Sequence, residues 1–145
     1  MAENTIQIIL VEDDEVDAEA IQRAFKKYKI ANPVHRASDG IEALEILRGL
    51  GGRQALTWPY LILLDINMPR MNGIEFLNEL RKDSHLNDAI VFVLTTSNND
   101  KDKLSAYDRN IAGYMLKSRA GEDFIHLIEM LKFYWRYVEF PPRKN

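Results

Sequence analysis

Four separate segments of the sequence carry polar side chains that could take part in one reaction. Each group stands directly after a short run of apolar residues. The side chains are carboxylates, hydroxyls and one amine: Glu12, Asp13, Asp14, Asp65, Thr95, Thr96 and Lys117. Carboxylates that crowd together repel one another unless a cation lies between them, and Mg²⁺ prefers carboxylate, carbonyl and water oxygens. The sequence therefore predicts a site for Mg²⁺, or for Mn²⁺ in its place.

The predicted ion suggests what the carboxylates do. Asp13 and Asp65 would bind the metal directly, and Glu12 would act through a water molecule. The main-chain carbonyl of Asn67 would be a further ligand. A carboxylate beside Mg²⁺ can attack phosphorus and form an aspartyl phosphate, while the protein supplies charge neutralisation and alignment. We therefore predict that Asp65 is the nucleophile.

Lys117 and Thr95 suit the product of that attack. Lys117 would pair as a point charge with one phosphoryl oxygen, and Thr95 would donate its hydroxyl to another. Each residue also has a structural explanation, because lysines are common on surfaces and a threonine can simply end a strand. In the same way, Asp13 or Asp14 could cap the helix that follows. The functional interpretation is favoured because four independent strand ends carry matching chemistry.

The elements that would position these residues alternate along the chain. Five apolar runs predict strands: Ile6–Val11, Val34–Ala37, Tyr60–Leu64, Ile90–Leu94 and Ala112–Leu116. Apolar residues three and four apart predict helices at 20–28, 41–47, 74–80 and 121–138, and a weaker one at 100–108 anchored by Leu104 and Tyr107. Near-continuous apolar strands separated by helices predict a parallel sheet covered on both faces. All the strands of such a sheet end at one edge, where ligands bind, so the polar residues should meet there.

Length and composition limit the other possibilities. The chain has 145 residues, which suits one domain with a hydrophobic core. A net charge of −3 does not suggest a nucleic-acid partner. The absence of cysteine excludes disulfides and thiolate chemistry and favours a reducing cytoplasm. The N-terminal stretch MAENTIQIILVEDDE is predicted to be neither a signal peptide nor a membrane span, so no membrane partner is expected.

Four motifs, in order and suitably spaced, resemble the receiver domain of bacterial two-component response regulators over nearly the whole chain. They are VEDD (Val11–Asp14), LLDINMPRMNG (Leu63–Gly73), VLTTS (Val93–Ser97) and GYMLK (Gly113–Lys117). The resemblance implies an α/β, flavodoxin-like, doubly wound sheet of five parallel strands in the order 2-1-3-4-5 with five helices. It also implies a phosphoacceptor that takes a phosphoryl group from a histidine of a sensor kinase. Such a protein is not an enzyme in the usual sense, although it assists its own phosphorylation and dephosphorylation.

The resemblance also assigns roles by position. It makes Asp65 the acceptor and Thr95 a switch residue, coupled to the aromatic ring of Tyr114. Asn67 and Ser97 occupy positions that tune water access to the phosphoryl group and hence its lifetime. One departure concerns Lys117, which the family usually follows with a proline in a cis bond. Here Ser118 follows, so this bond is either trans, with a differently shaped loop, or cis at a cost of roughly 2.5–4 kcal/mol.

The C-terminus narrows the resemblance further. The Lys117–Ser118 pair and the aromatic segment FYWRYVEFPPRKN (Phe133–Asn145) are similar to single-domain regulators that partner phytochrome-type, light-sensing histidine kinases. We predict a receiver domain over residues 1–138 and a short tail over 139–145. With no DNA-binding domain expected in this chain, the signal would leave through protein–protein contacts.

The last predicted helix has two apolar stripes. Phe124, Ile128, Leu131 and Trp135 form the predicted core face, and Met130, Phe133, Tyr134 and Tyr137 form a second stripe. A helix that is apolar on two sides needs two partners. We predict a homodimer through the second stripe and the neighbouring fifth strand. The alternative is that the C-terminal tail folds back over the second stripe.

Two other functions fit parts of the pattern. A phosphatase with an aspartyl-phosphate intermediate characteristically uses Asp-x-Asp, whose second Asp is a general acid, but here that position is Asn67. A receiver fold kept only for docking would be expected to lack Asp65, Asp13 or Lys117, and the sequence has all three.

Overall fold

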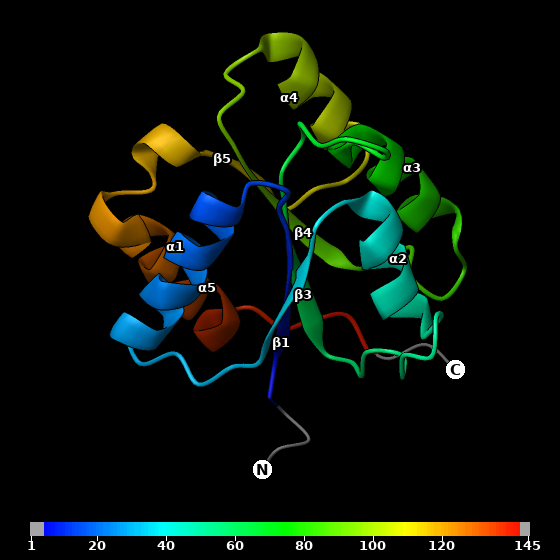
Figure 1. Cartoon of the computed structure of the whole chain (residues 1–145), viewed down its shortest axis with the longest axis horizontal. Coiled ribbons are helices and arrows are strands. Elements are labelled where there is room, and N and C mark those ends of the chain that lie inside the picture. The colour runs from blue at the N-terminus through cyan, green and yellow to red at the C-terminus, as the bar shows by residue number, and fades with distance from the viewer. Residues whose placement is uncertain (1–4, 143–145) are drawn as a thin grey trace.

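Five parallel strands form the central layer of the protein, in the predicted order β2-β1-β3-β4-β5 (Figure 1). The computed structural model describes residues 5–142. The strands are β1 (Gln7–Val11), β2 (Val34–Ala37), β3 (Tyr60–Leu64), β4 (Ile90–Thr95) and β5 (Gly113–Leu116). Because the strand order reverses between β1 and β3, the switch point of the sheet lies where these two strands end.

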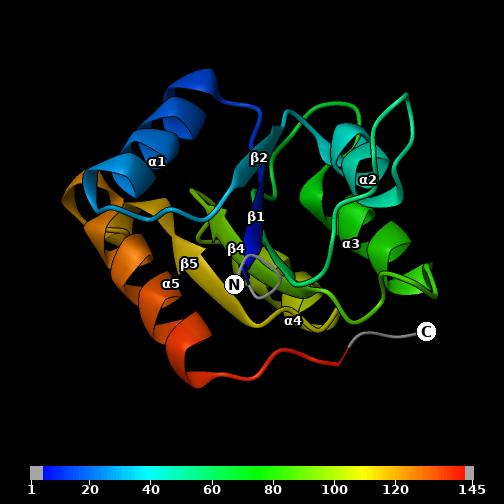
Figure 2. The ribbon, with the colours of Figure 1, turned by 90° about the horizontal axis from the view of Figure 1, so that it is seen from below.

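Helices cover both faces of the sheet. They are α1 (Glu15–Lys27), α2 (Gly40–Arg48), α3 (Gly73–Lys82), α4 (Asp100–Tyr107) and α5 (Ile125–Tyr137). Figure 2 shows α1 and α5 on one side of the sheet and α2 and α3 on the other. The predicted flavodoxin-like fold, with its strand order and five helices, is confirmed. No helix among residues 5–142 combines the length and the apolarity that crossing a membrane requires.

The apolar runs of the sequence are explained by burial on both faces of the sheet. All five residues of β3 are buried. Successive side chains of a strand point to opposite faces, so Ile62 and Leu64 pack beneath α2 and α3, whereas Leu61 and Leu63 pack beneath α1 and α5. A strand with helices on both sides therefore needs apolar residues at every position rather than at alternate ones.

The two helices nearest β5 depart from the sequence prediction. The last helix begins at Ile125, not at 121, because a short 3₁₀ turn (Glu122–Phe124) precedes it and both Asp123 and Phe124 have positive φ. In α4 the predicted anchors were wrong: the exposed fraction of Leu104 is 67% and that of Tyr107 is 51%. Ala106 is the buried residue of α4, so this helix packs on the sheet through one small side chain.

The C-terminal segment crosses the molecule after α5 (Figure 2). Phe140 packs between two aromatic rings, with its centroid 5.9 Å from that of Tyr134 and 6.2 Å from that of Trp58. The segment therefore links α5 to the loop before β3. The predicted tail, 139–145, is described only as far as Pro142.

Candidate functional site

The predicted acidic residues meet at the carboxyl end of β1 and β3. These strands pair in parallel with Val11 beside Leu64, and the Asp65 amide donates a hydrogen bond to the Val11 carbonyl at 3.0 Å. The next residue after each strand, Glu12 or Asp65, is therefore brought to the same place. Oxygens of Glu12, Asp13 and Asp65 all lie within 4.8 Å of one another. Glu12 and Asp65 are buried, whereas Asp13 is partly exposed.

Lys117, at the end of β5, reaches across to this acidic group. Its Nζ lies 2.7 Å from Glu12 Oε1 and 3.1 Å from Asp65 Oδ2, and it also lies 2.7 Å from Asp17 Oδ2. Asp17 was not predicted as a site residue. A signal was present, because Asp17 falls in the first turn of the helix that follows the acidic motif, so it faces the same edge of the sheet.

The second oxygen of Asp65 is held by other donors. Thr95 donates its hydroxyl to Asp65 Oδ1 at 2.7 Å, and the Asn67 amide donates to the same atom at 3.2 Å. The start of α3 packs closely against this turn: a Cβ on Gly73 would lie 2.5 Å from the Asp65 carbonyl oxygen. No real Cβ comes so close, so Gly73 is the residue type that lets α3 begin directly beside Asp65.

The charges of the site alter its proton affinities. Burial raises the pKa of Glu12 to about 7, although the hydrogen bond from Lys117 acts in the opposite direction. Burial would lower the pKa of Lys117, but its hydrogen bonds to Asp17 and Glu12, together with the negative charges of Asp65 and Glu12, outweigh burial and raise that pKa above its ordinary value. Lys117 is thus a permanent cation among carboxylates that need one.

The oxygen cluster fits a hard divalent cation. Three carboxylates supply only oxygen ligands, and the partial exposure of Asp13 leaves room for water or phosphate oxygens in the coordination shell. This is the manner in which Mg²⁺ is usually bound, through one or two carboxylates, retained waters and phosphate. Glu12, Asp13 and Asp65 therefore match the predicted metal site.

A chain of hydrogen bonds leads from Asp65 to α4 and β5. The amide of Ser97 donates to Thr95 Oγ1 at 3.3 Å, and the hydroxyl of Tyr114 donates to the Ser97 carbonyl at 2.8 Å. The Ser97 hydroxyl donates to Asp102 Oδ2, in the first turn of α4, at 2.6 Å. The half-buried Tyr114 ring packs against the core beneath α2 and α3. Asp102, which the sequence did not indicate, joins α4 to the site.

Two arginines hold the loops that carry the acidic residues. Arg36, in β2, donates from Nη2 to the carbonyl oxygens of Glu12 at 3.0 Å and Asp13 at 3.2 Å. Arg70 donates two hydrogen bonds to Asp39, the N-cap of α2, and so fixes the loop after Asp65. These contacts pre-set the loop backbone before any ligand binds.

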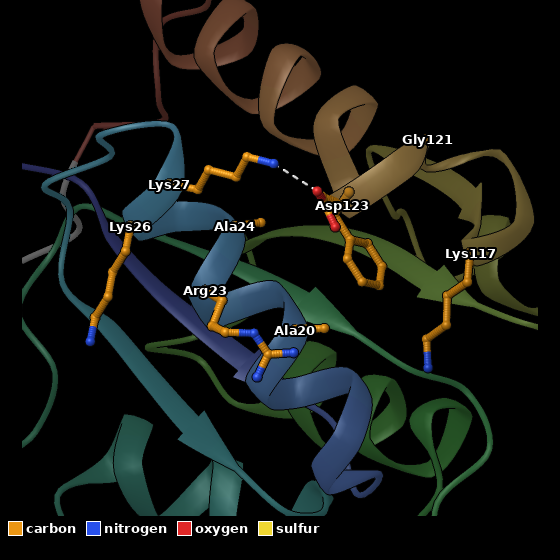
Figure 3. A pocket seen from close by; sticks show the side chains of 9 residues that line it. Ala20, Arg23, Ala24, Lys26, Lys27, Lys117, Gly121 and Asp123 are labelled. Atoms are coloured by element: carbon orange, nitrogen blue, oxygen red, sulfur yellow. Dashed lines mark hydrogen bonds and ion pairs between the residues drawn. The ribbon is translucent and has the colours of Figure 1, made fainter.

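A groove opens beside the site, between α1 and the loop that joins β5 to α5 (Figure 3). Its volume is about 620 Å³, and its apolar lining includes Ala20, Ala24 and Phe124. Lys117 lies at one edge of the groove. Lys27 bridges α1 to Asp123 on the opposite loop, with 2.7 Å between Nζ and Oδ2.

Two alternatives that the sequence left open are resolved by the backbone. Asp14, one of the alternative helix caps, is the N-cap of α1 and accepts a hydrogen bond from the Asp17 amide. The Lys117–Ser118 bond is trans, since Trp58–Pro59 is the one cis peptide bond among residues 5–142. Lys117 instead begins a 3₁₀ turn, so the loop after β5 takes the first of the two predicted shapes.

The second apolar stripe of α5 is divided between the core and the surface. Met130 and Tyr134 pack partly against the core, and Tyr134 contacts Phe92 edge-to-face. Phe133 and Tyr137 remain 66% and 64% exposed. Phe140 of the tail covers part of Tyr134, as the alternative prediction suggested, and leaves Phe133 and Tyr137 at the surface.

The fold and this edge define a doubly wound α/β protein with a polar site at the switch point of its sheet. A family model described as the response regulator receiver domain matches residues 8–129. The chain belongs to this family. Residues 5–142 contain one receiver fold and no DNA-binding domain.

Individual relatives agree with this assignment. The chain is 36% identical over 135 residues to the probable methanogenesis regulatory protein FilR2 of Methanothrix harundinacea, covering 92% of this chain and 86% of that one. It is 33% identical over 128 residues to the response regulator Rcp1 of Synechocystis, covering 88% and 87%. A manganese-bound structure of Rcp1 superposes with a TM-score of 0.81 at 32% identity, covering 94% of this chain and 99% of the other. The phosphorylated cyanobacterial phytochrome response regulator RcpA superposes with a TM-score of 0.84 at 33% identity, with the same coverage.

Proposed function

We propose that this chain is a phosphoacceptor response regulator that receives a phosphoryl group from a sensor histidine kinase on Asp65. The observation that carries the proposal is the meeting of Asp65 with a largely buried lysine, a hydroxyl donor and two further acids at one sheet edge. The phosphorylated state named for the similar protein RcpA supports it.

In the proposed reaction, a carboxylate oxygen of Asp65 attacks the phosphorus of a phosphohistidine. A P–O bond forms as the P–N bond breaks, and the electron pair of that bond returns to the imidazole. Lys117 and Thr95, which contact opposite oxygens of Asp65, are placed to donate to phosphoryl oxygens.

The acidic cluster would hold Mg²⁺ or Mn²⁺ during this step. Asp13 and Asp65 would bind directly, Glu12 through water and Asn67 through its carbonyl. The ion would neutralise charge on the phosphoryl group. The manganese-bound form of Rcp1 supports this arrangement.

The signal would pass from Asp65 to the α4–β5 region. A phosphoryl group would draw Thr95 toward it, and the hydrogen bond from Tyr114 to the Ser97 carbonyl would keep the ring inward. Asn67 and Ser97 would tune hydrolysis of the phosphoryl group, and exchanging both residues should change its decay rate.

One assay separates this function from its alternatives. We expect incubation with acetyl phosphate and Mg²⁺ to add one phosphoryl group, detected by intact mass, and Asp65→Asn to abolish it. Steady hydrolysis of many phosphoesters would favour a phosphatase, and no adduct on the native chain would favour a docking module.

The partners follow from the relatives. The phytochrome named for RcpA supports a bacterial phytochrome as the kinase, acting in the cytoplasm, and relative rates of phosphotransfer from candidate kinases would test this. We also propose a homodimer through α5 and β5, centred on the exposed Phe133 and Tyr137 with Met130 and Tyr134 behind them. Sedimentation that finds only monomer at high concentration would exclude the dimer.

A further inference from the structure

Three carboxylates share one amine at the centre of the site. A protonated lysine has three N–H donors. Among residues 5–142, Lys117 Nζ pairs with three acids, Glu12 and Asp17 at 2.7 Å and Asp65 at 3.1 Å. The two short contacts go to residues other than Asp65. The amine is therefore fully engaged before any phosphoryl group arrives.

Asp17 differs from the other two acids. The exposed fraction of its side chain is 33%, against 2% for Glu12 and 7% for Asp65. It comes from the first turn of α1 rather than from a strand end, and its oxygens are not part of the oxygen cluster that suits a metal. It is the one partner of Lys117 that neither cation binding nor phosphoryl transfer requires.

We propose that Asp17 is a positioning residue that holds the Lys117 amine toward α1 and thereby restrains phosphorylation of Asp65. The inference rests on the proposed phosphoacceptor function. To donate fully to a phosphoryl oxygen, Lys117 must loosen one of its present contacts. The contact with Asp17 should cost least to loosen, because Asp17 is the most exposed of the three acids and water can solvate its carboxylate.

The excess of negative charge at the site also supports a restraining role for Asp17. Asp13 adds a fourth carboxylate beside Glu12 and Asp65, so the acids at this edge outnumber Lys117 and repel an incoming phosphoryl group until cations balance them. Removing the Asp17 charge leaves Lys117 anchored by the buried Glu12 at 2.7 Å. The lysine would then keep its place and offer more of its charge to the phosphoryl group.

The test compares Asp17→Asn with the native protein in saturating Mg²⁺. We expect the second-order rate of phosphorylation by acetyl phosphate to rise about two- to fivefold, and the dissociation constant of the phosphoryl mimic beryllofluoride to fall by a similar factor. The apparent KM for acetyl phosphate should carry most of the change, since the effect is on attraction of an anion. The Asp17→Glu variant, which keeps a carboxylate at this position, should have a phosphorylation rate and a beryllofluoride dissociation constant close to those of the native protein.

The matched control is Glu15→Gln, which removes the same charge from the same first turn of α1, at a side chain that does not pair with Lys117. It reports the general effect of charge at a helix N-terminus. The hydrogen bond from the Asp17 amide to the Asp14 side chain uses neither the Asp17 nor the Glu15 side chain, so it should survive in every variant. Equal thermal midpoints for the native protein and the Asp17→Asn variant would show that folding is not the cause.

The outcomes separate this inference from the function beneath it. If the native chain forms the Asp65 adduct but Asp17→Asn reacts no faster than Glu15→Gln, only the role of Asp17 is overturned. If the native chain forms no adduct and binds no beryllofluoride, the phosphoacceptor function fails, and this inference fails with it.

Discussion

At the carboxyl end of the sheet, a lysine is surrounded by carboxylates; at the amino end, aromatic rings pack against one another. The first group contains Glu12, Asp17, Asp65 and Lys117. The second is a series of contacting rings in the order Tyr60, Trp58, Phe140 and Tyr134, with neighbouring centroids 5.0 to 6.2 Å apart. Both groups join segments far apart in the sequence, but the first does so through ion pairs and the second through the packing of apolar rings.

The two ends of the sheet contribute differently to the stability of the fold. Carboxylates held together repel, and burial raises the pKa of Glu12 to about 7, so the carboxyl end is less stable than an apolar edge of the same size. Edge-to-face aromatic pairs contribute about 0.5–1.5 kcal/mol each, and the amino end has several of them. Unfavourable carboxylate repulsion therefore lies at the carboxyl end of the strands, where a bound cation can relieve it. Favourable aromatic packing lies at the amino end of the same strands.

The largest expected effect comes from removing the cation of the carboxyl end. In metal-free buffer, Lys117→Ala should lower the free energy of unfolding by about 3 kcal/mol, because buried Glu12 and Asp65 lose their counter-ion. Urea denaturation would measure the loss. Adding Mg²⁺ should recover part of it, since a cation that binds only the folded state stabilises it by an amount that grows with the logarithm of its concentration above the dissociation constant.

The control for that change is Lys26→Ala, which removes an exposed lysine from α1 and should shift stability by less than about 0.5 kcal/mol. A Lys117→Ala protein as stable as the control would mean that the carboxyl end is not under electrostatic strain.

An intermediate effect is expected at the amino end. Phe140→Ala should lower the free energy of unfolding by about 1–2 kcal/mol, below the range for a fully buried phenylalanine, because Phe140 is half-buried between Tyr134 and Trp58. Acetyl phosphate should label this variant at the native rate, since Asp65 lies at the opposite end. Thermal denaturation and mass spectrometry would test the two parts.

Phe133→Ala removes the same side chain from the exposed side of α5, where 66% of it faces solvent. Its stability should remain within about 0.5 kcal/mol of native, and any effect should be on self-association. Equal losses from both phenylalanine variants would show that the tail does not tie the amino end together.

The sequence predicted the carboxyl end better than the amino end for a physical reason. An apolar strand ends where polar residues begin, and parallel strands end together, so Asp13, Asp65 and Lys117 could be placed from local patterns alone. Phe140 could not, because its partners depend on the path of the tail. The prediction that Leu104 and Tyr107 anchor α4 was wrong because α4 packs through a single alanine. Such a helix has almost no apolar periodicity to detect. Asp17 was missed because it lies in the first turn of α1 and not at a strand end, where the site residues were sought.

The smallest expected effect concerns Asp39, which supports the loops at the carboxyl end but does not contact Lys117 or its three acidic partners. Asp39 Oδ1 accepts from the Glu42 amide at 2.9 Å as the N-cap of α2, and both its oxygens accept from Arg70. Asp39→Ala should lower the free energy of unfolding by about 1 kcal/mol at pH 7, and Asp39→Asn, which can still cap, by about half of that. The exposure of Arg70, whose side chain is 59% accessible, keeps the ion-pair share small.

The pH dependence separates the cap from the ion pair. The hydrogen bonds from Arg70 hold the pKa of Asp39 below its ordinary value of 3.8, against the opposing effect of burial. The folded state therefore binds this proton less readily than the unfolded chain, so the charge contributes its full stability above about pH 4 and loses it as the pH falls through the lower, folded-state pKa. The difference in unfolding free energy between native protein and Asp39→Asn should thus be constant from about pH 5 to 8 and shrink below about pH 4. A difference that grows on acidification would show that the Asp39 charge is not stabilised by Arg70, and that the loop after Asp65 is held by other means.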